Sequence, residues 1–372
     1  MILQFGTSRF LQAHVDLFAW QARESGQTVP DITIVQASGD QERARRLPAF
    51  ANPAGFPVII RGVEDGRVRD QSIMVRSVVA GLAARHDWHA LCDLFVGPVT
   101  HVISNTGDSG FDVAASDRRP PDAGAPPVSF CGMLAALLRL RWAAGRPGIT
   151  VLPCELRSGN GSALRHIVSA LVNDQGGEPD FLAWLGSECL WADTLVDRIV
   201  SEAIEPAGAI AEPYALWAIQ GQPGLALPFT HPSIVVTDDL EPYERLKLHI
   251  LNLGHSWLAE GWRKWGGPIG MTVREAIADP HLGSSLKSVY QTEVIPGFET
   301  RGMAGEAARY VTTTLERFEN PFLAHRLQDI FQHHRMKVDR RVGDFIRWVE
   351  ETGGDIALPQ LRALARDTEI TQ

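Results

Sequence analysis

The N-terminal residues constrain the fold most, because a short strand, a tight turn and an amphipathic helix follow one another there. Residues 2–5 are strand-like, Gly6 opens the turn, and residues 11–23 have helix-like apolar spacing. A dinucleotide-binding turn requires this order, since glycine permits the tight turn and the next helix N-terminus can hold a pyrophosphate. Ser8, however, stands where the second glycine of the usual fingerprint belongs. Taken as a bare motif, the turn therefore also suits an ordinary strand–helix connection.

Short apolar runs continue to alternate with helical segments through about the Asp238 region. Further strands are expected at residues 31–37, 57–63, 68–79, 101–104, 149–153 and 233–237. The second and third of these flank Glu64-Asp65-Gly66, a hairpin turn sequence. Strands that alternate with helices are typical of α/β folds, whereas the chain beyond Pro242 has mainly helical spacing.

The end of the strand at 31–37 does not decide which dinucleotide would bind. A carboxylate there would bind the ribose hydroxyls of NAD, whereas an arginine would accommodate the 2′-phosphate of NADP. Asp40 follows the strand, and Arg43, Arg45 and Arg46 come behind it. Asp40 could bind ribose or cap the next helix, and the arginines could meet a phosphate or form a solvated helix face.

A polar, glycine-containing loop follows the strand at 101–104 and begins with Asn105 and Thr106. Such a loop at the carboxyl end of a parallel strand is suited to the cofactor edge of the sheet. Asn105 and Thr106 could contact the ribose or the nicotinamide. A simple turn is an equally good interpretation of the same residues.

The most distinctive polar pattern lies in residues 241–260, where apolar residues recur at helical spacing. On a wheel of about 100° per residue, four polar side chains fall within an arc of roughly 140°: Glu244, Lys247, Asn252 and His255. One helix face would then carry an acid, an amine, an amide and an imidazole. A solvated helical face is the alternative.

Two other residues of this segment bear on that choice. Gly254 stands in mid-helix, where glycine costs about 1 kcal/mol relative to alanine, so we expect a packing reason for it. His249 points away from the polar arc and is not counted as a site residue.

Lys247, Asn252 and His255 belong to the motif E-x-x-K-L-x-x-L-N-x-x-H-S. This motif resembles the catalytic helix of the long-chain polyol dehydrogenases, the mannitol dehydrogenase family. Residues 3–13 and 153–161 are similar to the tagaturonate and fructuronate reductase branch of that family, and the resemblance covers nearly the whole chain.

The resemblance implies a Rossmann-like dinucleotide-binding domain over residues 1–238 and a mainly α-helical substrate and catalytic domain over 239–372. It also implies NAD as the cofactor. The expected cofactor-binding residues are Gly6, Thr7, Ser8, Arg9, Phe10, Leu11, Asn105 and Thr106. The chain departs from the family pattern of the turn at Ser8, Arg9 and Gln12.

The family also implies roles for the polar set. Lys247 would be the general acid/base, which requires burial or a nearby cation to lower its pKa from about 10.4. Asn252 and His255 would hydrogen-bond the developing alkoxide, and Glu244 would relay the proton to solvent. Asp197 would orient the substrate or the lysine, although a structural ion pair with its neighbour Arg198 is the alternative. No metal is needed for this chemistry.

Four further positions bear on the comparison with the family. Arg317 and Asn320 match the family segment R-F-x-N-P, but ordinary helix-terminus residues are the favoured interpretation. Lys337 could meet a sugar carboxylate. Leu156 replaces an asparagine that helps mannitol dehydrogenases to bind the substrate oxygen, which argues against simple mannitol oxidation.

The sequence thus predicts an NAD-dependent oxidoreductase that interconverts a sugar acid or polyol and its keto form, most like tagaturonate or fructuronate reductase. The alternatives are a mannitol or hexitol-phosphate dehydrogenase and a non-catalytic dinucleotide-binding protein. The sugar's stereochemistry, the choice between NAD and NADP, and the oligomeric state are left open.

Charge, hydropathy and cysteine content indicate which partners and which cellular compartment to expect. The formal net charge of −9 argues against a nucleic-acid-binding surface. No apolar run is long enough to span a bilayer, and the N-terminus does not resemble a signal peptide, so we expect a cytoplasmic protein without membrane contact. The four cysteines are far apart and have neither disulfide nor zinc-site spacing.

Overall fold

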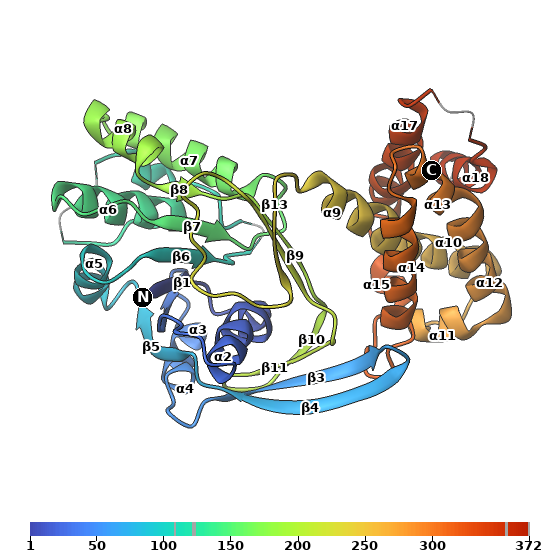
Figure 1. Ribbon diagram of the computed structural model, residues 1–372, viewed down its shortest axis with the longest axis horizontal. Coiled ribbons are helices and arrows are strands. Elements are labelled where there is room, and N and C mark those ends of the chain that lie inside the picture. Colours follow the sequence, from blue (N-terminus) through green and yellow to red (C-terminus); the bar gives the residue numbers. More distant parts are fainter. Residues whose placement is uncertain (108, 121–123, 354–355, 371–372) are drawn as a thin grey trace. The chain divides into compact units, whose positions relative to one another are not determined.

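The computed structural model describes residues 1–107, 109–120, 124–353 and 356–370 (Figure 1). The chain divides into two compact units. Unit 1 comprises Met1–Ile60, Gln71–Ala211 and Ala215–Leu240, and unit 2 comprises Arg61–Asp70, Glu212–Tyr214 and Glu241–Gln372. Two short segments from the first part of the chain therefore belong to the second unit. A division into domains at residues 238 and 239 stays a prediction.

A six-stranded parallel sheet forms the centre of unit 1, in the order β5-β2-β1-β6-β7-β8 (Figure 1). Its strands are β1 (Ile2–Phe5), β2 (Ile32–Gln36), β5 (Val78–Ala83), β6 (His101–Ser104), β7 (Thr150–Pro153) and β8 (Leu190–Trp191). Numbered within the sheet, this is the Rossmann order 3-2-1-4-5-6. The predicted α/β Rossmann-like fold is confirmed. All residues of β1, β2, β6 and β7 are buried, and most of them are apolar, as expected for parallel strands covered on both faces.

Helices and two smaller sheets complete the first part of the chain. The helices are α1 (Arg9–Leu11), η1 (Gln12–Asp16), α2 (Leu17–Glu24), α3 (Gln41–Arg45), α4 (Leu47–Phe50), α5 (Trp88–Val96), η2 (Ala115–Arg118), α6 (Phe130–Ala143), α7 (Asn160–Asp174) and α8 (Pro179–Ser187). The sheet orders are β10-β11-β3-β4 and β13-β12-β9. Their strands are β3 (Phe56–Glu64), β4 (Arg67–Val75), β9 (Thr194–Asp197), β10 (Val200–Ala203), β11 (Ala209–Ala211), β12 (Leu216–Gln220) and β13 (Ile234–Thr237).

One predicted strand is wrong in extent. The run expected at 68–79 is broken at Arg76–Ser77 into β4 and β5. At the break, the Ser77 hydroxyl donates a hydrogen bond to the remote Asp16 carbonyl at 2.7 Å. The hairpin turn between β3 and β4 is confirmed, with positive φ at both Asp65 and Gly66.

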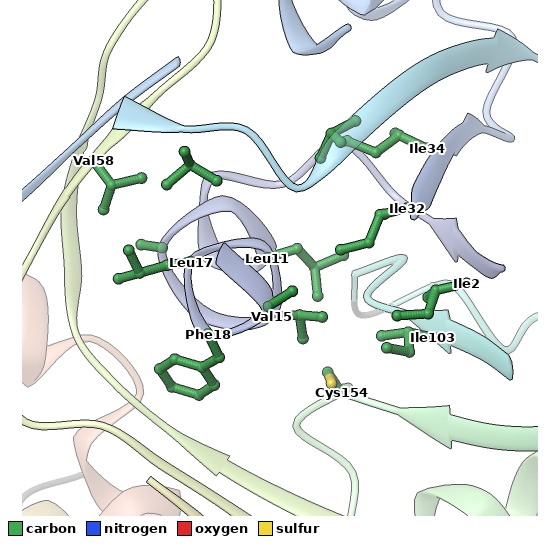
Figure 2. Close-up of a cluster of buried hydrophobic side chains, with 14 of the residues drawn as sticks. Ile2, Leu11, Val15, Leu17, Phe18, Ile32, Ile34, Val58, Ile103 and Cys154 are labelled. Carbon is green, nitrogen blue, oxygen red and sulfur yellow. The ribbon is translucent and has the colours of Figure 1, made fainter. Parts of the chain in front are cut away.

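The helix after β1 packs its apolar side chains against the parallel sheet. In Figure 2, Leu11, Val15 and Phe18 come from this helix, and Ile2 and Ile34 come from the strands. The same cluster contains the Cys154 thiol, and all four cysteines are free. Cys154 therefore serves as a small buried hydrophobe, as expected.

Unit 2 is mainly helical, as predicted. Its helices are α9 (Glu241–Leu246), η3 (Lys247–Asn252), α10 (Leu253–Trp265), α11 (Val273–Ala278), α12 (Pro280–Val289), η4 (Tyr290–Val294), α13 (Ile295–Glu299), α14 (Ala304–Phe318), α15 (Leu327–Phe331), α16 (His334–Val338), η5 (Asp339–Gly343), α17 (Asp344–Glu350) and α18 (Pro359–Ile370). The unit has its own apolar core, to which Ile250, Tyr290 and Phe345 contribute. In the part of the chain that the structure describes, no helix is both long and apolar enough to cross a membrane.

The carboxyl group of Asp16 is fully buried on the helix that packs against the sheet. Neither of its oxygens has a hydrogen-bond partner among the described residues. Burial raises the pKa of Asp16 to about 8, and the nearby Gln4 amide offsets only part of that rise. The native protein therefore holds Asp16 in its protonated form near neutral pH.

Replacing Asp16 with Asn should stabilise the protein increasingly as the pH rises. In the unfolded chain Asp16 loses its proton above about pH 3.9, whereas the native state keeps it up to about pH 8. Between these values the native state binds more protons, so wild-type stability falls with pH. We expect Asp16→Asn to gain about 1–3 kcal/mol at the upper end of this window. Urea unfolding across that range measures the gain, with exposed Glu24→Gln on the adjoining helix α2 as control. A pH-independent difference would contradict the account.

Candidate functional site

A cavity of about 720 Å³ lies at the carboxyl ends of β1, β2 and β6 within unit 1. The strand order reverses between β1 and β6, and ligands bind at this point of a doubly wound sheet. Six of the eight predicted cofactor residues line the cavity: Gly6, Thr7, Ser8, Arg9, Asn105 and Thr106. Phe10 and Leu11 do not line it. They pack into the core, where Leu11 is fully buried and Phe10 stacks on His14.

Gly6 is required by the shape of the turn. Its φ is +119°, and a Cβ there would lie 2.4 Å from the Asn105 carbonyl oxygen. The Gly6 amide donates to the Val35 carbonyl at 3.0 Å, and the Asn105 amide donates to the Phe5 carbonyl at 2.9 Å. The turn after β1 and the loop after β6 thus touch backbone to backbone at the floor of the cavity.

Ser8, which stands in place of the second fingerprint glycine, has an extended backbone with φ −69° and ψ 143°. Its hydroxyl accepts a hydrogen bond from the Leu11 amide at 3.3 Å and so caps α1. The position therefore needs no glycine conformation. Gln12, another departure from the family pattern, contacts a different segment: its side-chain oxygen accepts a 2.6 Å hydrogen bond from the Gly208 amide.

At the end of β2, the Gln36 amide donates to Ser38 Oγ at 2.7 Å and to the Asp40 carbonyl at 3.2 Å. The Asp40 carboxylate accepts from the Arg43 amide at 3.1 Å, so Asp40 caps α3, one of its two predicted roles. Asp40 does not line the cavity, whereas Arg43 and Arg46 do.

Sequence reasoning missed the part that Glu155 plays beside this cavity. Glu155 is buried, and it accepts hydrogen bonds from the Thr106 amide at 3.1 Å and the Thr106 hydroxyl at 3.0 Å. Ser104 donates to its other oxygen at 3.0 Å. Burial raises the pKa of Glu155, and these donors oppose the rise. An acid directly after a parallel strand was the available signal for a residue that fixes the cofactor-edge loop.

Asp197 ends β9 and is buried in unit 1. The start of this strand is clamped by Asn160, whose amide donates to the Thr194 carbonyl at 3.0 Å and accepts from the Thr194 amide at 2.9 Å. Arg198 donates to the Ala13 carbonyl at 2.7 Å. The strand therefore holds Asp197 firmly, and its role in the reaction stays a proposal.

The residues predicted to be catalytic on one helix do lie in helical segments, but the helix is not regular. Lys247 and Asn252 are the first and last residues of η3, a π-helical segment between α9 and α10. The helical wheel that placed the four polar side chains in one arc assumes a regular α-helix. It is therefore wrong across η3, because the backbone hydrogen bonds of a π-helix join residues five positions apart. Glu244, on α9, is half-buried like Lys247 and Asn252, and His255 on α10 is buried. Such π segments often occur at functional sites.

Gly254 has the packing role that was expected. The Ile250 carbonyl, within η3, accepts a 2.8 Å hydrogen bond from the fully buried Tyr290 hydroxyl. A Cβ at Gly254 would lie 2.0 Å from that hydroxyl and 3.0 Å from a ring carbon of Phe318. Glycine thus leaves room for the bond that satisfies a carbonyl of the π segment.

Gly254→Ala should therefore destabilise the protein although alanine is the better helix former. The Tyr290 hydroxyl would have to move, and we expect a net loss of about 1–3 kcal/mol in the free energy of unfolding. Denaturant unfolding measures the loss. Gly305→Ala on α14 is the matched control, since the nearest atom to its added Cβ is the end of the Arg309 side chain at 3.5 Å. Equal stability of the two variants would contradict the packing role.

His249 is structural, consistent with its omission from the site. It is fully buried, its Nδ1 lies 3.0 Å from the Arg341 carbonyl, and its ring packs against Phe345 and Trp348. Burial lowers the pKa of His249 to about 4, so the imidazole is neutral at physiological pH.

Arg317 and Asn320 are more than ordinary helix-terminus residues. The Arg317 guanidinium forms a two-point ion pair with Glu212, at 2.9 Å from Nε and 2.8 Å from Nη2, and lies 4.4 Å from the Tyr214 ring centroid. Both charged side chains are 2% exposed. Asn320 donates to the Arg61 carbonyl at 3.2 Å. These contacts bind the short segments 61–70 and 212–214 into unit 2.

Comparisons with known proteins agree with this architecture. The family model for the mannitol dehydrogenase Rossmann domain matches residues 1–227, and the model for the mannitol dehydrogenase C-terminal domain matches residues 239–362. The protein is thus an oxidoreductase that acts on CH–OH groups. The chain belongs to the mannitol dehydrogenase family, as the sequence predicted.

Curated relatives and solved structures add detail. The altronate oxidoreductase of Halalkalibacterium halodurans is 30% identical over 352 residues, covering 88% of this chain and 67% of the relative. That of Bacillus subtilis is 29% identical over 357 residues, covering 88% and 71%. A substrate-free D-sorbitol dehydrogenase has a TM-score of 0.83 at 20% identity, covering 99% of this chain and 80% of that one. The Pseudomonas fluorescens mannitol 2-dehydrogenase, solved with NAD and D-mannitol, has a TM-score of 0.71 at 19% identity, covering 99% and 78%. The two structures support the fold.

Proposed function

We propose that this protein is an NAD-dependent oxidoreductase that interconverts a sugar acid and its keto form, in the manner of its relatives named altronate oxidoreductase. The observation that carries the proposal is the set of Lys247, Asn252 and His255 on one partly buried helix with a π segment. These residues supply a proton carrier and hydrogen-bond donors, which is what the oxidation of a secondary alcohol requires of the protein.

NAD is proposed as the cofactor because the cavity in unit 1 suits a dinucleotide. The close approach at Gly6 leaves no space for a Cβ, and the Ser8-capped helix start can face a pyrophosphate. Gly6, Thr7, Ser8 and Arg9 would hold the phosphates, and the loop that begins with Asn105 would face the ribose and nicotinamide. When bound, the nicotinamide supplies the acceptor or donor of the hydride. The similar mannitol 2-dehydrogenase was solved with NAD.

The chain's own residues handle the proton and the charge. During oxidation, Lys247 Nζ takes the proton of the substrate hydroxyl while the hydride leaves the carbon that bears this hydroxyl. During reduction, Lys247 returns a proton to the carbonyl oxygen. The Asn252 amide and the His255 ring donate hydrogen bonds to the developing alkoxide. Glu244, one turn before Lys247, passes the proton to solvent, and Asp197 orients the substrate.

The location and partners follow the same proposal. The substrate is a small sugar acid, with a polyol as the alternative. The four free cysteines suit a reducing compartment, which supports the cytoplasm as the site of action.

Oxidation of altronate, mannonate, mannitol and sorbitol, each with NAD and with NADP, tests the proposal. Formation of the reduced cofactor is followed by its absorbance. We expect the sugar acids to exceed the polyols in kcat/KM by at least roughly tenfold, and NAD to be the better cofactor. Turnover of the neutral polyols alone would favour a mannitol dehydrogenase. Binding of NADH without turnover of any of the four would favour the non-catalytic alternative.

A further inference from the structure

Arg341 lies on η5 and contacts the helix that carries the proposed catalytic residues. Its Nη1 donates hydrogen bonds to the Asn252 carbonyl at 3.3 Å and to the buried Ser256 hydroxyl at 3.0 Å. The side chain is only partly exposed. The guanidinium is therefore fixed beside Asn252, and two of its nitrogen atoms, Nε and Nη2, are not used in these bonds.

A second cation, Lys337, stands next to Arg341, and the nearby acid Glu260 pairs with His334 instead. Lys337 precedes Arg341 by four residues, and its ammonium donates to the Ile330 carbonyl at 2.8 Å. Among the described residues, no carboxylate forms an ion pair with Arg341 or Lys337. The acids of the same helical stretch, Asp339 and Asp344, pair with Arg347 instead. Burial lowers the pKa of Lys337, and Arg341 is close enough to lower it further, so the two like charges repel each other at a cost that an external anion would reduce.

The pKa shifts of the neighbouring groups also indicate an excess of positive charge around Arg341. Burial, and then Arg340, lower the pKa of Arg341 to about 10, which leaves it protonated at neutral pH. Burial, and then Arg341, lower the pKa of Lys337. His325 lies nearby, and its ring centroid is 4.8 Å from that of His255. Burial lowers the pKa of His325, Asp329 opposes this change, and Lys337 and Arg341 add to it.

We propose that Arg341, with Lys337 beside it, binds the carboxylate of the substrate and thereby selects sugar acids over neutral polyols. A guanidinium presents planar N–H groups that match a carboxylate, and such charge-assisted bonds are shorter and stronger than neutral ones. The carboxylate neutralises the two cations, while Asn252 and His255 remain available for the reacting oxygen. This inference rests on the proposed function, since it names the residue of the same site that recognises the substrate's charged group.

The test compares binding of altronate and of the neutral polyol altritol by calorimetry, with NADH present so that no oxidation occurs. We expect wild type to bind altronate at least roughly tenfold more tightly than altritol. Arg341→Gln should weaken altronate binding by about tenfold to a hundredfold and leave altritol within about twofold. Arg340→Gln, the exposed neighbour with the same charge, should keep the preference for altronate.

Two results would overturn the carboxylate site: equal binding of both ligands by wild type, or equal weakening of both by Arg341→Gln, which would indicate a purely structural role. Arg341→Lys should retain part of the preference, since it keeps the charge. The outcome is separable from that of the proposed function. Charge-selective binding without turnover would refute the oxidoreductase proposal and support the carboxylate site. Turnover of altronate that Arg341→Gln does not affect would support the oxidoreductase proposal and refute the carboxylate site.

Discussion

Lys247→Ala should lower kcat by about 10²–10⁴-fold while the protein remains folded, because the variant lacks the group that we propose to exchange a proton with the substrate oxygen. Lys247 is half-buried at the start of η3 and is not part of the apolar core of unit 2. The core residues that follow it, Ile250 and Leu251, are unchanged by the substitution. We therefore expect a change of about 0.5 kcal/mol or less in the free energy of unfolding.

Steady-state kinetics on altronate and denaturant unfolding measure the two effects of Lys247→Ala. Lys287→Ala is the matched control, since Lys287 is an exposed lysine on α12. A small primary amine in the assay should partly restore turnover of Lys247→Ala and should not affect the control. Near-normal turnover of the variant would remove Lys247 from the mechanism.

Arg317→Met should reduce the free energy of unfolding by about 3–5 kcal/mol, because it leaves the Glu212 carboxylate buried without its counter-ion. Both side chains are 2% exposed, and Arg317 Nη2 lies 2.8 Å from a Glu212 carboxylate oxygen. Water therefore cannot replace the guanidinium without opening the structure. The loss should appear as a lower denaturant midpoint. It should be largest near neutral pH, where an unpaired carboxylate would be charged.

Two further variants separate charge from packing at this site. Combining Arg317→Met with Glu212→Gln should recover part of the stability, since no buried charge is then left unpaired. Arg309→Met on the same helix is the control: Arg309 is 75% exposed, and its 3.5 Å contact with Glu306 should be worth about 1 kcal/mol or less. A loss for Arg317→Met as small as that of the control would contradict the account.

The strands of the central sheet could be predicted because a parallel sheet buried on both faces favours short, mainly apolar segments. The apolar residues are Ile2, Leu3 and Phe5 in β1, Val102 and Ile103 in β6, and Val151 and Leu152 in β7. The break between β4 and β5 could not be predicted, and the residue at the break, Ser77, bonds to Asp16, which lies 61 positions away. Local patterns contain no information about such remote partners.

The candidate site shows the same limit. The residue types and spacing of Lys247, Asn252 and His255 identified the helix, but a helical wheel presumes one period and so could not show the π segment. The contacts of Glu155 with Thr106 and of Arg341 with Asn252 span 49 and 89 positions. Such contacts arise from folding, and only the structure reveals them.

The most direct test of the central claim is transfer of deuterium from labelled NADH to tagaturonate. The protein is incubated with the keto acid and with NADH that carries deuterium at the transferred position, and the sugar acid product is analysed by mass spectrometry. The account predicts that the product carries the deuterium and that Lys247→Ala forms it far more slowly. A product without deuterium, or no sugar acid at all from protein that binds NADH, would contradict hydride transfer as the function of this chain.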